Sequence, residues 1–186
     1  KRSKAAPWVE TYKWAILCFI AVGFWNTVGA GLLGFAINTP IALYYMQGMN
    51  MTAAHGHAAL FGVYGMLGIG LMLFCLRGLT DRLAWSDSAL RPAFWLLNLG
   101  LAMMVFLSLA PAGIYQAWAS ITRGVWYARS PEVVHSSFME TMVWLRVPGD
   151  IVFSIGILFL TVFMWRLVFQ KRAERKLLAS SVSAAK

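Results

Sequence analysis

The sequence predicts an all-α protein, a bundle of four transmembrane helices without a separate soluble domain. Three observations support this prediction. Of the 186 residues, 60% are hydrophobic and only 12% are charged, whereas soluble domains contain about 25% charged residues. The hydrophobic residues gather in four long runs, and nearly all the charged residues lie between these runs or at the two ends of the chain. A run of about 20 apolar residues is long enough to cross the hydrocarbon core of a bilayer as a helix.

The first run predicts a span at about residues 14–37, and the second predicts a span at about residues 52–76. Neither run contains Asp, Glu, Lys or Arg, which are the residues that cost most at membrane depth. The third span is expected at about residues 92–115 and opens with Pro92, because proline is favoured in the first turn of a helix. The fourth span is expected at about residues 147–170. The whole chain is therefore expected to form one membrane domain.

The distribution of basic residues predicts the orientation of the bundle. An even number of spans places both ends of the chain on one side of the membrane. Thirteen of the sixteen Lys and Arg residues lie at this side, near the two ends or in the connection between the second and third spans. Cytoplasmic connections are enriched in Lys and Arg, so both ends are expected in the cytoplasm. Because the positive charge flanks apolar spans, the net charge of +9 does not indicate binding to nucleic acid.

The candidate functional residues are His55 and His57, the two histidines of an uncharged membrane-spanning run. An ionisable side chain within a span is by default a candidate for function. Each residue of an α-helix is rotated by about 100°, so residues two apart lie on nearly opposite faces. A single metal ion would favour a spacing of three or four residues. The spacing of two suits separate irons on either side of the helix, as in a helix wedged between two haems.

Small residues surround both histidines, among them Ala54, Gly56 and Ala58. They would leave room for a flat macrocycle over each imidazole. The same residues would also let a neighbouring helix approach closely. In that alternative, the histidines form hydrogen bonds between helices and bind no metal. The sequence favours haem ligation for this pair and leaves the alternative open.

The connection between the third and fourth spans supplies three candidate binding residues, Arg123, Arg129 and Arg146. It lies on the side of the membrane where the second span begins, which is the end that carries the histidines. Arginine binds carboxylates through parallel hydrogen bonds, so these residues are candidate partners for haem propionates. Alternatively, they face water beside an interfacial belt of Trp and Tyr. His135, in the same connection, is expected to be a surface residue.

Four segments carry a family likeness: Asn38–Tyr45, Ala54–Gly65, Trp126–Ser130 and Leu145–Asp150. Together they resemble the quinol-dependent nitric oxide reductases, bacterial members of the haem-copper oxidase superfamily. The resemblance implies that His55 is the proximal ligand of a high-spin haem b and that His57 is one axial ligand of a low-spin haem b. It also implies a non-haem iron whose ligands lie outside this segment. The implied reaction reduces two NO molecules to N2O and water with two protons and two electrons from quinol.

The resemblance covers nearly the whole chain and corresponds to the C-terminal portion of the catalytic chain in that family. The expected partners are the remaining N-terminal part of the enzyme, quinol, nitric oxide and the lipid of a bacterial inner membrane. A second copy of the chain, forming a homodimer, is a further possible partner. This segment alone is expected to be inactive. Three other functions remain: a haem-binding electron carrier without catalysis, a terminal oxidase of the same superfamily, and a cofactor-free transporter or scaffold.

Overall fold

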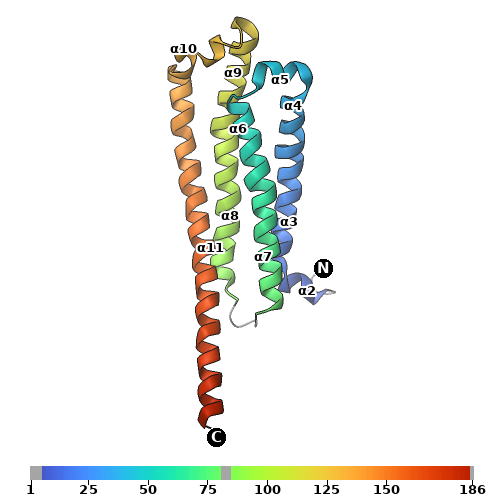
Figure 1. Cartoon of the computed structure of the whole chain (residues 1–186), viewed down its shortest axis with the longest axis vertical. Helices are drawn as coiled ribbons and strands as arrows, with labels where there is room; N and C mark the ends of the chain where they lie inside the picture. Colours follow the sequence, from blue (N-terminus) through green and yellow to red (C-terminus); the bar gives the residue numbers. More distant parts are fainter. Residues whose placement is uncertain (1–5, 81–84, 185–186) are drawn as a thin grey trace.

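The structure, a computed structural model, describes residues 6–80 and 85–184, with side chains described as far as Phe169. Within these residues, four helices are long and apolar enough to cross a membrane. They stand side by side, and no strand occurs in the described part of the chain (Figure 1). The predicted all-α bundle of four spans is confirmed. The four spans are Lys13–Asn38, Asn50–Gly78, Asp87–Arg123 and Ser137–Phe169.

Three of the four spans change from α-helix to π-helix and back along their length. The first span consists of α3 (Lys13–Trp25), η1 (Asn26–Leu33) and α4 (Gly34–Asn38). The second consists of α6 (Asn50–His57), η2 (Ala58–Gly65) and α7 (Met66–Gly78). The third consists of α8 (Asp87–Met103), η4 (Met104–Leu109) and α9 (Ala110–Arg123). Such π-helical turns are rare and are frequent at functional sites.

The third and fourth spans are longer than the sequence predicts. The third helix passes through Pro111 and ends at Arg123 rather than near residue 115, since η4 changes the hydrogen-bond register directly before this proline. The fourth helix, α11 (Ser137–Ala184), begins at Ser137 rather than near residue 147, so Pro148 lies inside the helix. Pro148 is at an exposed position of α11.

Close backbone approach holds the third and fourth spans together. A Cβ atom built on Gly100 of α8 would lie 2.5 Å from the backbone nitrogen of Phe153 on α11. Gly149 and Gly156 of α11 are in similarly tight contact with α8 and η4. Small residues at helix contacts allow this proximity, and the resulting van der Waals packing helps to drive helix association in lipid. The packing therefore depends on glycine at these positions.

Side-chain hydrogen bonds join the spans at several depths. The indole nitrogen of Trp14 donates to Oδ1 of Asp87 at 2.8 Å, and that of Trp25 donates to Oδ1 of Asn98 at 2.9 Å. Both bonds link the first span to the third. Trp25 is 1% exposed, so its N–H group needs this partner in the absence of water. These two bonds therefore pair polar groups of the first and third spans with one another.

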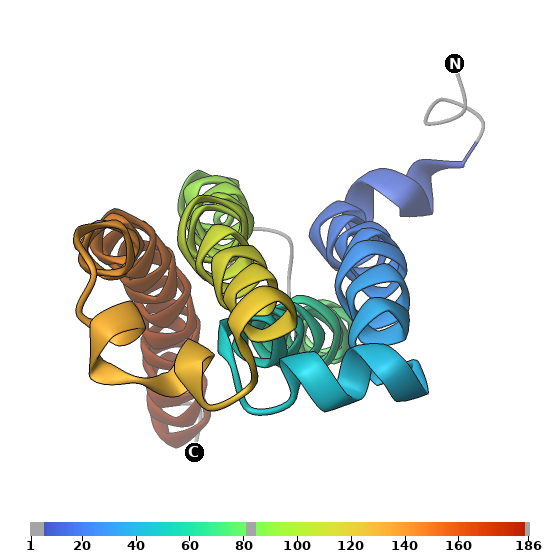
Figure 2. The ribbon, with the colours of Figure 1, turned by 90° about the horizontal axis from the view of Figure 1, so that it is seen from above.

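The end of the bundle that the sequence places outside the cytoplasm is covered by short helices. Helix α5 (Pro40–Met46) lies across this end on one side of α9, and η5 (Tyr127–Arg129) and α10 (Pro131–Val134) lie toward α11 on the other side (Figures 1 and 2). The helix α2 (Pro7–Thr11) and the end of α11 lie toward the opposite end of the molecule. Several basic side chains that predict the orientation lie outside the described residues: Lys1, Arg2, Lys4, Arg82 and those from Lys171 onward.

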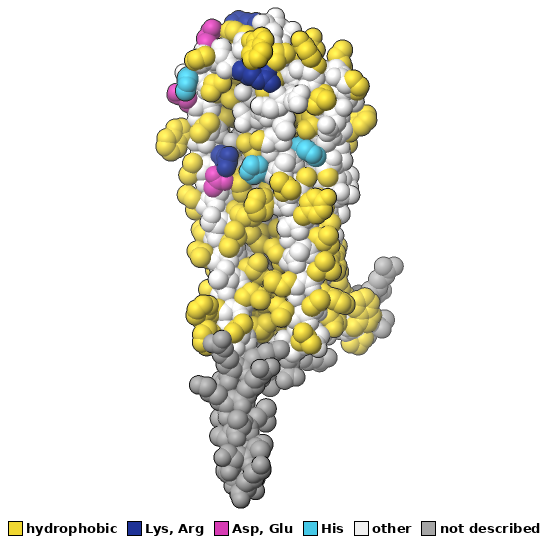
Figure 3. All heavy atoms as spheres, viewed as in Figure 1, with side chains coloured by type: hydrophobic (Ala, Val, Ile, Leu, Met, Phe, Trp, Pro, Cys, Tyr) yellow, Lys and Arg dark blue, Asp and Glu magenta, His cyan; other side chains and the backbone are white. Residues whose placement is uncertain are grey.

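Most of the surface between the two ends is apolar. On the face shown in Figure 3, hydrophobic side chains cover the length of the helices, and the coloured charged side chains lie in the half nearer the covered end. Histidine side chains are also visible on this face, in the half nearer the covered end. Such a surface suits lipid or further helices rather than water.

Candidate functional site

His55 and His57 lie in the last turn of α6, directly before the π-helical segment η2. The start of α6 is fixed by Gln116 of α9, whose Oε1 accepts hydrogen bonds from the backbone nitrogen and Nδ2 of Asn50, both at 2.9 Å. Gly113 of α9 also touches the backbone of Met51. The third span thus sets the position of the helix that carries both histidines.

The His55 ring faces the first span. Its Nδ1 lies 2.9 Å from the carbonyl oxygen of Gly29 in η1. This carbonyl can only accept a hydrogen bond, so Nδ1 carries the proton and Nε2 carries the free lone pair. A Cβ atom built on Gly34 would lie 2.9 Å from Cε1 of His55. The absence of a side chain at Gly34 is therefore needed for this ring position.

The His57 ring is held by its own helix. Its Nδ1 lies 2.9 Å from the carbonyl oxygen of Ala53, which again places the proton on Nδ1 and the lone pair on Nε2. The ring centroid lies 6.5 Å from that of Phe61 in η2. Both histidines are half-buried, and no hydrogen bond to either Nε2 is found among the described residues.

The two imidazoles fit haem iron as a cofactor. Imidazole nitrogen is an axial ligand of haem, and histidines that bind metal donate their other N–H to a carbonyl or carboxylate. Each ring here has that second bond. The hydrogen bond between helices, which the alternative interpretation expects, does occur at His55, but it occupies Nδ1 alone. Within the described residues, no group of three or more His, Cys, Asp or Glu side chains could hold a metal ion.

Two of the three candidate arginines are engaged at the covered end of the bundle. Arg123 donates to the hydroxyl oxygen of Tyr127 at 2.6 Å and lies over its ring. Tyr127 donates in turn to Glu132, and this bond is the main reason that the pKa of Tyr127 is above its ordinary value. Arg129 donates to the backbone carbonyls of Val125 and Gln47. Neither contact points to a carboxylate of a cofactor.

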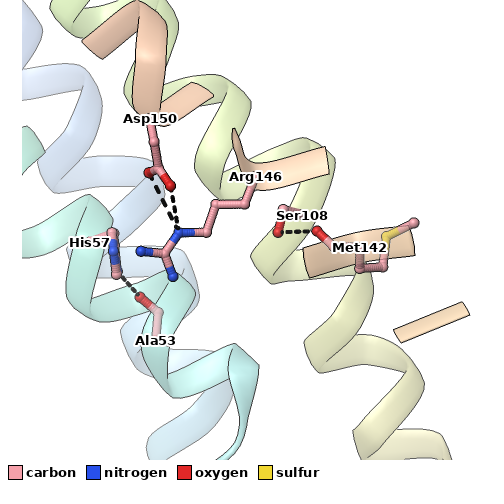
Figure 4. Close-up of polar contacts among 6 residues, drawn as sticks. All are labelled: Ala53, His57, Ser108, Met142, Arg146 and Asp150. Atoms are coloured by element: carbon pink, nitrogen blue, oxygen red, sulfur yellow. Dashed lines mark hydrogen bonds and ion pairs between the residues drawn. The ribbon is translucent and has the colours of Figure 1, made fainter. Parts of the chain in front are cut away.

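Arg146 is the candidate arginine that lies beside a histidine. It is on α11, where its Nε is 3.2 Å from Oδ2 and 3.5 Å from Oδ1 of Asp150. In Figure 4, the guanidinium points from α11 toward the turn of α6 that carries Ala53 and His57. Asp150 is not among the candidate site residues predicted from the sequence, although its spacing of four from Arg146 is typical of an ion pair on a helix.

An aromatic contact joins the histidine helix to α11 near this ion pair. The rings of Phe61 and Phe153 meet edge to face with centroids 5.2 Å apart. Phe61 is one helical turn after His57, and Phe153 is nearly one turn after Asp150. The sequence did not indicate this contact, nor the roles of Gly29 and Gly34, because residues far apart in sequence carry no mutual signal in a single chain.

Comparison with known proteins assigns the family. The sequence profile of the family described as "Cytochrome C and Quinol oxidase polypeptide I" matches residues 5–152. The chain belongs to the haem-copper oxidase family. The matched region contains both histidines and the ion pair of Arg146 and Asp150. The family resemblance seen in the sequence is thereby confirmed.

Within this family, a curated relative is a nitric oxide reductase subunit from Stutzerimonas stutzeri. It is 30% identical to the chain over 141 residues, which cover 70% of this chain and 28% of the relative. The chain therefore spans less than a third of that relative's length. The haem-copper oxidase family consists of membrane oxidoreductases with haem and metal cofactors, and the four apolar spans agree with that setting.

Proposed function

We propose that the chain is the part of a membrane nitric oxide reductase that ligates its haems, with His55 on a high-spin haem b and His57 on a low-spin haem b. The observation that carries this proposal is that both imidazole rings form the same kind of hydrogen bond. Each Nδ1 is bonded to a backbone carbonyl, so each Nε2 has a lone pair ready for iron. Imidazoles that served only to join helices would have no reason to share this arrangement.

The residues of the chain would hold and orient the cofactors. Gly29 and Ala53 fix the two tautomers through their carbonyl oxygens. Arg146 offers its Nη groups to a haem carboxylate on the His57 side, since these groups have no hydrogen-bond partner among the described residues. When bound, the high-spin haem, together with a non-haem iron ligated outside this segment, supplies the site at which NO is reduced.

The same proposal specifies the electron donor and the membrane in which the protein lies. Quinol would supply the two electrons, and two protons would be taken up for each N2O and water formed. The protein would lie in a bacterial inner membrane with both ends of this segment in the cytoplasm, as the basic residues indicate. Its partners would be the remaining N-terminal part of the enzyme and the lipid bilayer.

The experiment measures NO turnover and metal content of the full-length protein in detergent, with reduced quinol as the electron donor. We expect anaerobic consumption of NO with formation of N2O, two b haems, and one iron beyond the haem iron. Heat-denatured protein is the control for direct reaction of quinol with NO. Bound haem without reduction of NO or O2 would contradict the proposal and support an electron carrier.

A terminal oxidase is the second candidate, because the family description names cytochrome c and quinol oxidases. In that case, the same preparation would consume O2 rather than NO and would contain copper in place of the extra iron. We favour NO because of the 30% identity to a nitric oxide reductase subunit. The metal content therefore distinguishes the two candidates independently of turnover.

We expect Gly34→Ala to disturb the haem on His55 and to spare the haem on His57. The added methyl group would lie 2.9 Å from Cε1 of His55, so the ring must rotate or move. Resonance Raman spectra of the reduced full-length protein should show a shifted or weakened iron–histidine band, with unchanged low-spin bands. Gly23→Ala, where an added Cβ meets no atom within 4 Å, is the matched control. An unchanged iron–histidine band in Gly34→Ala would count against the assignment of His55.

A further inference from the structure

The ion pair of Arg146 and Asp150 is an unusual feature of a membrane span. Both residues lie within the apolar helix Ser137–Phe169, and their side chains are 42% and 43% exposed. Charged residues within spans are costly and usually face a polar cavity, a cofactor or a partner. Phe61 and Phe153 close the space between η2 and α11 nearby. Their exposure shows that neither side chain lies in the interior of the described bundle, and in Figure 4 the guanidinium points toward His57.

The geometry of the pair leaves one edge of the guanidinium free. Both carboxylate oxygens of Asp150 approach Nε of Arg146, at 3.2 and 3.5 Å. No hydrogen bond to either Nη is found among the described residues. In Figure 4, the Nη groups point toward Ala53 and His57. A guanidinium held at Nε presents its two Nη groups as a fork, which matches the two oxygens of a carboxylate.

We infer that Asp150 is a positioning residue for Arg146 and that its charge sets the reduction potential of the cofactor on His57. This inference rests on the proposed function, because it requires a haem at His57. Asp150 holds the guanidinium through Nε and balances its positive charge. Removing the carboxylate charge would make the surroundings of the iron more positive by one unit of charge. A positive charge favours the reduced form, which carries one electron more, so the potential should rise.

The alternative is that the pair only stabilises α11. Ion pairs at a spacing of four are common on helix surfaces and contribute little to stability. In that case, neutralising Asp150 would change the stability of the protein slightly and leave the potential of the haem unchanged. The reduction potential therefore separates the two interpretations.

The experiment is a redox titration of the low-spin haem in the full-length, haem-loaded protein. For Asp150→Asn, we expect about a tenfold change in the ratio of reduced to oxidised haem at a fixed potential, which corresponds to a rise of about 59 mV for one electron. Asp150→Glu keeps the charge and should restore most of the original potential. Glu140→Gln removes the same charge from an exposed position on α11 and is the matched control.

A double-mutant cycle tests whether Asp150 acts through Arg146. In an Arg146→Gln background, Asp150→Asn should shift the potential by less than it does alone, because coupled residues are not additive. Equal shifts in both backgrounds would overturn the positioning role. If Asp150→Asn does not accumulate, Arg146→Lys replaces it. Lysine keeps the charge but has no fork, so the inference predicts a shifted potential.

The outcomes separate this inference from the proposed function. An unchanged potential in Asp150→Asn, with low-spin bands intact, overturns the role of Asp150 and leaves the assignment of His57 standing. Persistence of the low-spin bands in His57→Ala overturns the proposed function and this inference together. A rise in Asp150→Asn that is absent in Glu140→Gln supports the inference.

Discussion

His57→Ala is expected to abolish the low-spin haem spectrum of the full-length protein, while His55→Ala is expected to remove or convert the high-spin haem. The two rings are held by different groups, Gly29 of the first span and Ala53 of their own helix. Loss of one imidazole removes one axial ligand and leaves the support of the other ring in place. Electron delivery should fail in His57→Ala, so NO consumption should fall to background in both variants.

Optical and electron paramagnetic resonance spectra of the oxidised and reduced protein measure this result. His135→Ala is the control, because His135 lies exposed in the connection between the third and fourth spans and should change neither haem. Loss of both haems from a single replacement, or intact bands in both variants, would contradict separate ligation. Addition of imidazole to His57→Ala should partly restore the low-spin bands if the cavity remains.

Gly100→Leu is expected to prevent α8 and α11 from packing and to remove most of the folded protein from the membrane. Even the Cβ of alanine would lie 2.5 Å from the backbone nitrogen and 2.7 Å from Cα of Phe153. These are backbone atoms, so the helices must separate. Overpacking a core typically costs about 1–3 kcal/mol, which we expect for Gly100→Ala, and leucine adds three more heavy atoms at the same contact.

Thermal unfolding in detergent, followed by size-exclusion chromatography, measures this effect. Gly23→Ala is the matched control, because an added Cβ there meets no atom within 4 Å. Alanine is the better helix former by about 1 kcal/mol, so this control should be neutral or slightly stabilising. A normal yield and melting temperature in Gly100→Leu would show that α8 and α11 do not pack as described.

The number of spans could be predicted from the sequence because charge is scarce and unevenly distributed. The connections and the two ends of the chain contain nearly all the charged residues, and each apolar run is long enough to cross a bilayer. The ends of the spans were harder to predict. The third and fourth helices each contain a proline, Pro111 and Pro148, and extend beyond the predicted spans. Whether a helix tolerates proline depends on its neighbours and its register, which a single sequence does not display.

The histidines could be found from the sequence because their spacing and uncharged setting are local properties. Their supporting groups could not, because the carbonyl of Gly29 and the gap at Gly34 belong to another span. The arginines also could not be ranked without contacts between distant parts of the chain. Three were equal candidates in the sequence, and only their contacts distinguish Arg146 from Arg123 and Arg129. The spacing of Arg146 and Asp150, by contrast, is a local signal that a single sequence does display.

The placement of both imidazoles in one turn of α6 has a mechanical consequence. Any tilt or sliding of this helix within the bilayer carries the two rings as a unit, because only Gly56 separates them in the chain. The distance that an electron would cross between them is then set mainly by the backbone of this helix, and the bond from His55 to Gly29 ties it to the first span. Thinner or thicker lipid should alter access to the site while leaving the rate of that internal step nearly constant.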